Sequence, residues 1–92
     1  MTANYTKAPA ALLPYSWDWA DWLAGAGDTI SSATVLVPAG LTAEGAATVD
    51  GAVVTQRVSG GTLGAIYKLV CQITTTGGLI DERSIQLAVM DR

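Results

Sequence analysis

The chain has 92 residues, of which half are hydrophobic and 14% are charged, and its five basic and eight acidic side chains give a net charge of −3. This length holds one hydrophobic core and leaves no room for separate substrate and cofactor domains. The hydrophobic fraction argues against a disordered chain, and the longest apolar runs, such as Ala10–Leu13, are too short to span a membrane. The low charge predicts a surface that partly faces other subunits.

The charged residues and the single cysteine narrow the possible partners. The five cations are scattered along the chain and form no basic stripe, so we expect no direct binding of nucleic acid. Cys71 is the only cysteine, which excludes an intrachain disulfide. Residues 1–15 lack the apolar region of a signal peptide, so we expect synthesis and use in a cytoplasm.

Residues 1–14 are predicted to form an extended N-terminal arm outside the domain of residues 15–92. Pro9 and Pro14 interrupt any regular helix or central strand in this segment. Two interpretations stay open: a plain frayed terminus, or an arm that docks on a neighbouring subunit and buries Leu12 and Leu13 there.

From Tyr15 onward the pattern indicates strands and turns. Trp17 and Trp19 alternate with Asp18, as in a strand, and residues 21–23 break that period, which predicts a bulge or one turn of helix. Residues 29–37 are rich in β-branched side chains and predict a strand. Residues 41–49 and 52–58 flank Asp50-Gly51, which predicts a β-hairpin with a two-residue turn.

Two further strands, joined by Gly77-Gly78, have the clearest period of two in the chain. The side chains predicted to face the core are Tyr67, Leu69, Cys71 and Ile73 on one strand and Ile85, Leu87 and Val89 on the other. Six or seven short strands of this kind predict an all-β fold, an immunoglobulin-like antiparallel β-sandwich without a disulfide. Tyr67, which opens the penultimate strand, is placed to tie its hydroxyl back to the preceding turn.

Residues typical of catalysis, cofactor binding or metal binding are not combined into a site. The chain has no histidine, and Cys71 lies in the middle of an apolar strand without a base, as a buried and unreactive thiol would. Asp18, Asp21 and Asp28 match no compact calcium loop and are interpreted as turn and cap carboxylates. The glycines occupy turns and precede no phosphate-binding element. We therefore predict no enzymatic activity, no cofactor and no metal.

Three tryptophans within six residues form the one unusual cluster. No basic residue lies between Pro9 and Gln56, whereas stacking platforms for nucleic acid normally lie in a positively charged groove. Alternation along a strand cannot bury all three on one side, so at least one is expected to face a neighbouring subunit. The predicted protein-interface residues are Leu12, Leu13, Trp17, Trp19 and Trp22.

Several short motifs occur together in an order that resembles a known family of virion proteins. They are Trp19-Ala20-Asp21-Trp22-Leu23, Gly27-Asp28-Thr29-Ile30, Val37-Pro38-Ala39-Gly40-Leu41, Val58-Ser59-Gly60-Gly61-Thr62, Gly64, Tyr67, Ile73-Thr74-Thr75 and Asp81-Glu82-Arg83-Ser84-Ile85. The set resembles small proteins of tailed bacteriophages known as fibre–DNA adaptor proteins. Arg57 departs from the family pattern, where an apolar residue is expected, and residues 1–14 lie outside the resemblance.

The resemblance implies an immunoglobulin-like structural protein of a tailed-bacteriophage virion, assembled in the host cytoplasm. One possible role is an adaptor at the head–tail neck or tail, including fibre attachment, in a symmetric assembly. The alternative is a capsid decoration protein on the head. The expected partners are portal or neck, tail, fibre or major capsid subunits and further copies of the chain, and they include neither nucleic acid nor a membrane.

Overall fold

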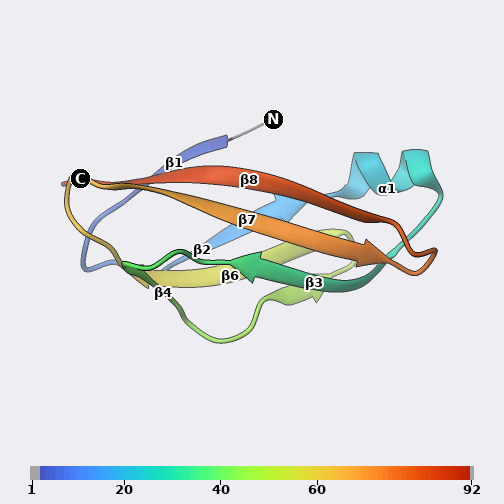
Figure 1. Cartoon of the computed structure of the whole chain (residues 1–92), viewed down its shortest axis with the longest axis horizontal. Helices are drawn as coiled ribbons and strands as arrows, with labels where there is room; N and C mark the ends of the chain where they lie inside the picture. Colours follow the sequence, from blue (N-terminus) through green and yellow to red (C-terminus); the bar gives the residue numbers. More distant parts are fainter. Residues whose placement is uncertain (1–2, 92) are drawn as a thin grey trace.

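Two facing β-sheets and one short helix make up the part of the chain that the computed structural model describes, residues 3–91 (Figure 1). The predicted all-β sandwich is confirmed. The elements are β1 (Ala3–Lys7), β2 (Leu13–Asp18), α1 (Ala20–Ala26), β3 (Ile30–Leu36), β4 (Leu41–Ala43), β5 (Thr48–Asp50), β6 (Val53–Gly60), β7 (Ile66–Thr75) and β8 (Ile80–Val89).

The strand order is that of an immunoglobulin-like sandwich. One sheet runs β1-β8-β7-β3, and the other runs β2-β6-β4, with β5 also paired to β6. In this order β3, β7 and β8 correspond to strands C, F and G, and β2, β6 and β4 correspond to B, E and D. The prediction was incomplete in two respects, since residues 3–91 hold eight strands and β1 pairs with β8 in parallel.

The N-terminal segment differs from the predicted arm, because β1 is a strand of the first sheet. Its register places Ala3 beside Ile85 and Lys7 beside Val89. The Lys7 side chain is fully buried, and its ammonium donates hydrogen bonds to the carbonyls of Gly60 at 2.6 Å, Ala8 at 2.7 Å and Pro9 at 3.3 Å. These bonds compensate the cost of burying a charge. Docking of residues 1–14 on a neighbour stays a prediction, and residues 1 and 2 lie outside the described part.

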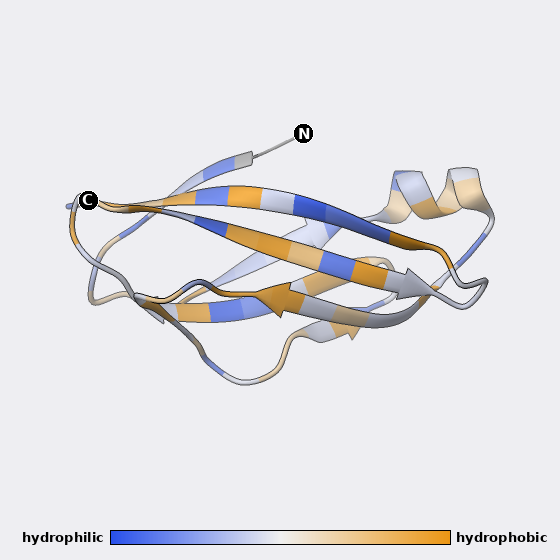
Figure 2. Ribbon diagram, viewed as in Figure 1, coloured by the Kyte–Doolittle hydropathy of each residue, from blue (hydrophilic) through white to orange (hydrophobic). Residues whose placement is uncertain are grey.

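The core lies between the two sheets and contains the side chains that the period of two assigned to it. Figure 2 shows hydrophobic and hydrophilic bands alternating along β7 and β8. Leu69, Cys71, Ile73, Leu87 and Val89 are buried, whereas Lys68, Gln72 and Gln86 are exposed. Trp17 on β2 and Trp19, which directly follows β2, pack into the same core. The predicted inward faces of both strands are therefore confirmed.

The predicted hairpin exists, but its turn is one residue further along the chain. Asp50 pairs with Val53, so the two turn residues are Gly51 and Ala52. Only Gly51 has a positive φ, at 60°, which is the arrangement of a type II′ turn and not of the type I′ turn that both residues at positive φ would give. The preceding predicted strand is split into β4 and β5, which both pair with β6.

Tyr67 fixes the turn before β7, as predicted. Its hydroxyl oxygen accepts a hydrogen bond from the backbone N–H of Thr62 at 2.9 Å. Its ring also lies so close to Gly40 that a Cβ there would come within 2.9 Å of it, so the residue must be glycine for this contact. The break at residues 21–23 is the helix α1, which ends at Gly27 with φ 66°.

Candidate protein-interaction surfaces

The side chains considered for chemistry have structural roles in the described chain. Cys71 is fully buried, and burial raises the pKa of its thiol, which favours the unreactive protonated form. Asp18 accepts a hydrogen bond from the N–H of Ala20 at the start of α1, at 2.9 Å. Within residues 3–91 no group of three or more acidic, cysteine or histidine side chains is placed to hold a metal ion.

Asp28 is an anchor between two loops. Its carboxylate accepts hydrogen bonds from the Thr76 hydroxyl at 2.5 Å, the Thr29 N–H at 2.8 Å and the Gly77 N–H at 3.1 Å. These donors, the Thr76 hydroxyl foremost, lower its pKa to about 2. The α1–β3 connection is thereby attached to the β7–β8 turn, which explains why an aspartate follows the helix at this position.

The five residues predicted to form an interface have unequal exposure. Trp17 and Trp19 are buried in the core of their own chain, and Leu13 and Trp22 pack partly against it. The rings of Trp19 and Trp22 make an edge-to-face contact with centroids 5.7 Å apart. Leu12 is 41% exposed. Of the five, Leu12 and, to a lesser degree, Leu13 and Trp22 keep surface that a partner could cover.

Arg83 closes the open side of the sandwich near these tryptophans. Its guanidinium lies 4.4 Å from the centre of the Trp19 ring and donates a 2.9 Å hydrogen bond to the backbone carbonyl of Asp18. A hollow of about 380 Å³ remains beside it, lined by Arg83, Ser84 and Ile85 near the first described residues of β1. Arg83 on β8 of the first sheet therefore links that sheet to the end of β2 in the second sheet.

One end of the sandwich carries three exposed apolar side chains on different segments. Leu12 in the β1–β2 connection, Leu63 in the β6–β7 connection and Met90 after β8 are 41%, 55% and 43% exposed. We call these three residues the loop end; the connections that carry them and the C-terminus lie on the left in Figure 1. Hydrogen bonds hold it in place: the Gly64 N–H donates to the Val89 carbonyl at 2.7 Å, and the Lys7 ammonium holds the β1–β2 connection.

The outward side of β3, β7 and β8 is a second candidate surface, which we call the outer face. It exposes Leu36 at 68%, Ile66 at 69% and Ile80 at 63%, with Val70 half-buried between them. On β7 and β8 it carries only two charged side chains, Lys68 and Glu82. Depletion of charge around large apolar residues is typical of protein interfaces. The sequence signal was present, because Ile66 and Ile80 occupy outward positions of their strands.

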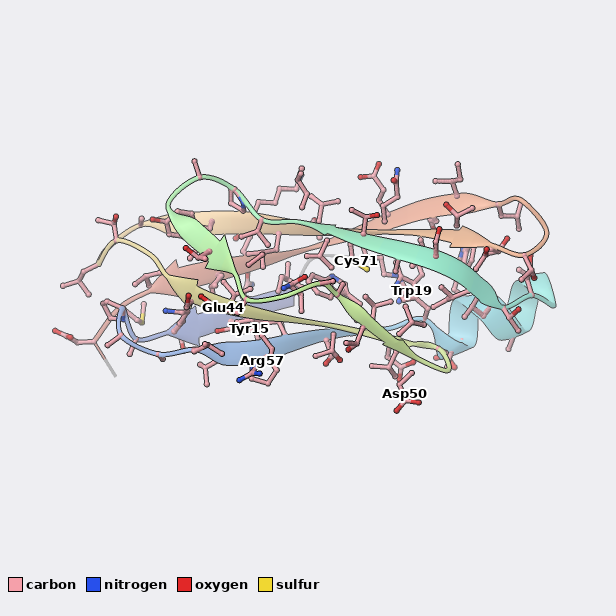
Figure 3. All side chains as sticks on the ribbon, turned by 90° about the horizontal axis from the view of Figure 1, so that it is seen from below. Tyr15, Trp19, Glu44, Asp50, Arg57 and Cys71 are labelled. Carbon is pink, nitrogen blue, oxygen red and sulfur yellow. The ribbon has the colours of Figure 1, made fainter. Side chains whose placement is uncertain are left out.

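The outward side of the opposite sheet and the loops beside it have a different character. Asp18, Glu44, Asp50 and Arg57 are all exposed there, so acidic side chains outnumber basic ones. In Figure 3 Arg57 and Asp50 project away from the ribbon, whereas Trp19 and Cys71 lie between the layers. Arg57, which departed from the expected pattern, is therefore an outward residue of β6 and leaves the core unchanged.

The fold and these surfaces define a small immunoglobulin-like sandwich domain of the kind that binds other proteins through its loops and sheet faces. The family model described as podophage GP4 fiber-tail adaptor protein gp77 matches residues 7–88, so the chain belongs to this family of phage adaptor proteins. Its role is that of a structural adaptor of the phage tail, which implies a non-enzymatic protein of the virion. No curated protein matches the chain.

The resemblance to phage fibre adaptors is thereby confirmed. No helix within residues 3–91 is both long enough and apolar enough to cross a membrane.

Proposed function

We propose that this chain links the tail of a podophage to its fibres, near the head–tail neck, as one of several symmetric copies held by protein–protein contacts. The observation that carries the proposal is the family match over residues 7–88, whose description names a fibre and a tail. An adaptor needs at least two separate contact surfaces, and the loop end and the outer face provide two apolar ones. The same match favours the tail over the capsid surface.

The loop end is the part we assign to another virion protein. Leu12, Leu63 and Met90 come from three segments, but the bonds around Lys7 and Val89 fix their relative positions before any partner binds. A preformed apolar patch loses little conformational entropy on docking, which favours affinity. Leu12 was predicted as an interface residue, and this arrangement supports that role.

The test is incorporation into virions. A phage lacking the gene is complemented with the chain carrying Leu63→Glu, and the adaptor in purified particles is quantified by mass spectrometry. The substitution buries a charge in the proposed contact and should lower incorporation at least tenfold. Arg57→Glu, on the opposite sheet, is the matched control and should be incorporated like the wild type.

Circular dichroism melts of both purified variants establish that the sandwich is intact. A folded Leu63→Glu chain that enters particles at the wild-type level would overturn the assignment of the loop end. An adaptor found in hundreds of copies on capsids without tails would overturn the tail role itself.

A further inference from the structure

The outer face has a pattern that fits a second copy of itself. We propose that two chains pack through their outer faces about a two-fold axis, with Lys68 of each chain paired to Glu82 of the other. This proposal rests on the assembly role argued above and names one contact within it.

The centre of the outer face is a row of residues that crosses three strands at one level. Leu36 on β3 pairs with Val70 on β7, and Val70 pairs with Ser84 on β8. Lys68 lies on one side of this row and Glu82 on the other, each one outward position away along its strand. The two exposed isoleucines, Ile66 and Ile80, lie one further outward position beyond them.

The sequence of outward side chains from the start of β7 to the central row therefore resembles the sequence from the start of β8 to the same row. Along β7 the outward residues run isoleucine, lysine, valine, and along the antiparallel β8 they run isoleucine, glutamate, serine toward the same row. A two-fold axis along the row brings Leu36 and Val70 close to their own copies. The same axis brings Lys68 over the Gln72 of the second chain, beside the neighbouring Glu82 and within reach of it, twice, and each isoleucine one strand from the other's position.

The two charges have no such partner within one chain. Lys68 and Glu82 are separated by four residues along the strands and by one strand across, which is about 14 Å between Cα atoms. Among residues 3–91 neither side chain makes a hydrogen bond or an ion pair. One lysine and one glutamate on an otherwise uncharged face, where Thr34, Gln72 and Gln86 accompany the apolar residues, are thus complementary to the same face of a second copy.

The size of the face is compatible with a dimer. Seven to ten residues in each of three strands, together with β1 at the edge, span roughly 500 Å² in projection. Side chains add relief, so the accessible area approaches the 800 Å² or so that each partner buries in a standard interface. The outward side of the opposite sheet is not complementary in charge to itself. Asp18, Glu44 and Asp50 outnumber Arg57 there, so two copies of that face would repel each other.

The experiment is sedimentation equilibrium of the purified full chain over a concentration series up to about 1 mM. The wild type should show a monomer–dimer equilibrium that weakens with salt. Lys68→Glu and Glu82→Lys each place like charges together twice and should each raise the dimer Kd at least tenfold. The double variant with both exchanges restores opposite charges and should return to within a few-fold of the wild-type Kd. Arg57→Glu is the control and should leave it unchanged.

Any one of three results overturns the proposal. The wild-type chain stays monomeric throughout, the dimer Kd is unchanged in both single variants, or the dimer Kd of the double variant is as high as that of the single variants. Circular dichroism confirms that each variant is folded. The two proposals fail separately, because incorporation of Leu63→Glu into particles is measured at the loop end. A monomeric wild type would refute only the dimer, and normal incorporation of Leu63→Glu would leave the dimer in place.

Discussion

Replacing one isoleucine in the core and one on the surface by alanine tests the register of the first sheet. Ile73 on β7 is completely buried, whereas Ile80 on β8 is 63% exposed, and both lie near the same turn. The same three carbon groups are removed at each site. The two variants therefore differ in burial and hardly at all in chemistry.

The expected loss of stability at Ile73 is about 3–4 kcal/mol. Removing three buried methyl or methylene groups costs about 2.4 kcal/mol in transfer free energy, and the cavity left behind adds to it. A domain of this size has a total stability of about 5–14 kcal/mol, so Ile73→Ala removes a large part of it. Ile80→Ala should change stability by no more than about 0.5 kcal/mol.

Urea unfolding followed by tryptophan fluorescence measures both variants, since Trp17 and Trp19 are buried in the folded state. Thermal melts give a second reading, with Ile73→Ala expected to melt about 15–25 °C below the wild type. Equal losses at the two sites would refute the difference in burial, and a larger loss at Ile80 would mean that β7 and β8 present the opposite faces to the core.

Three further predictions follow from single residues. The lowered pKa of Asp28 contributes stability that is present above about pH 4 and is lost as the pH falls through the folded value of about 2, so thermal melts from pH 6 to 2 should fall more steeply for the wild type than for Asp28→Asn. Gly51→Val should destabilise by about 1–2 kcal/mol in urea because φ is 60° there, whereas Asp50→Val, at an exposed strand position of β5 without a positive φ, should be nearly silent, and equal effects would refute the turn assignment. The Cys71 thiol should react with a disulfide reagent only as fast as the chain unfolds, and rapid labelling of the native protein would place it outside the core.

The elements that were predicted correctly are those specified by residues close together in the sequence. The strands around Cys71 and Leu87 followed from their alternation and from Gly77-Gly78 between them, and Tyr67 followed from its place at the start of a strand. The turn at Gly51 was misplaced by one residue because Asp-Gly fits a type I′ turn, whereas the register with β6 selects Gly51-Ala52.

Long-range contacts explain what the sequence did not predict. The strand Ala3–Lys7 is polar and is followed by Pro9, so nothing local marks it, and its partner β8 lies about 80 residues further along the chain. The buried Lys7 depends on carbonyls of the β1–β2 connection and of Gly60, which no spacing rule brings together. The outer face depends on register across three strands, and Leu36 beside Val70 becomes visible only in the folded sheet.

The parallel pairing of β1 with β8 also has a consequence for how the protein is made. A nascent chain exposes residues 3–7 early, but the strand edge that they complete is synthesised about 80 residues later. Closing so long a loop is entropically costly and slows folding, so the first sheet is completed only after translation has passed Val89. Prematurely terminated chains lack this closure, and the loop end, which depends on it, is formed only by chains that have been read through to β8.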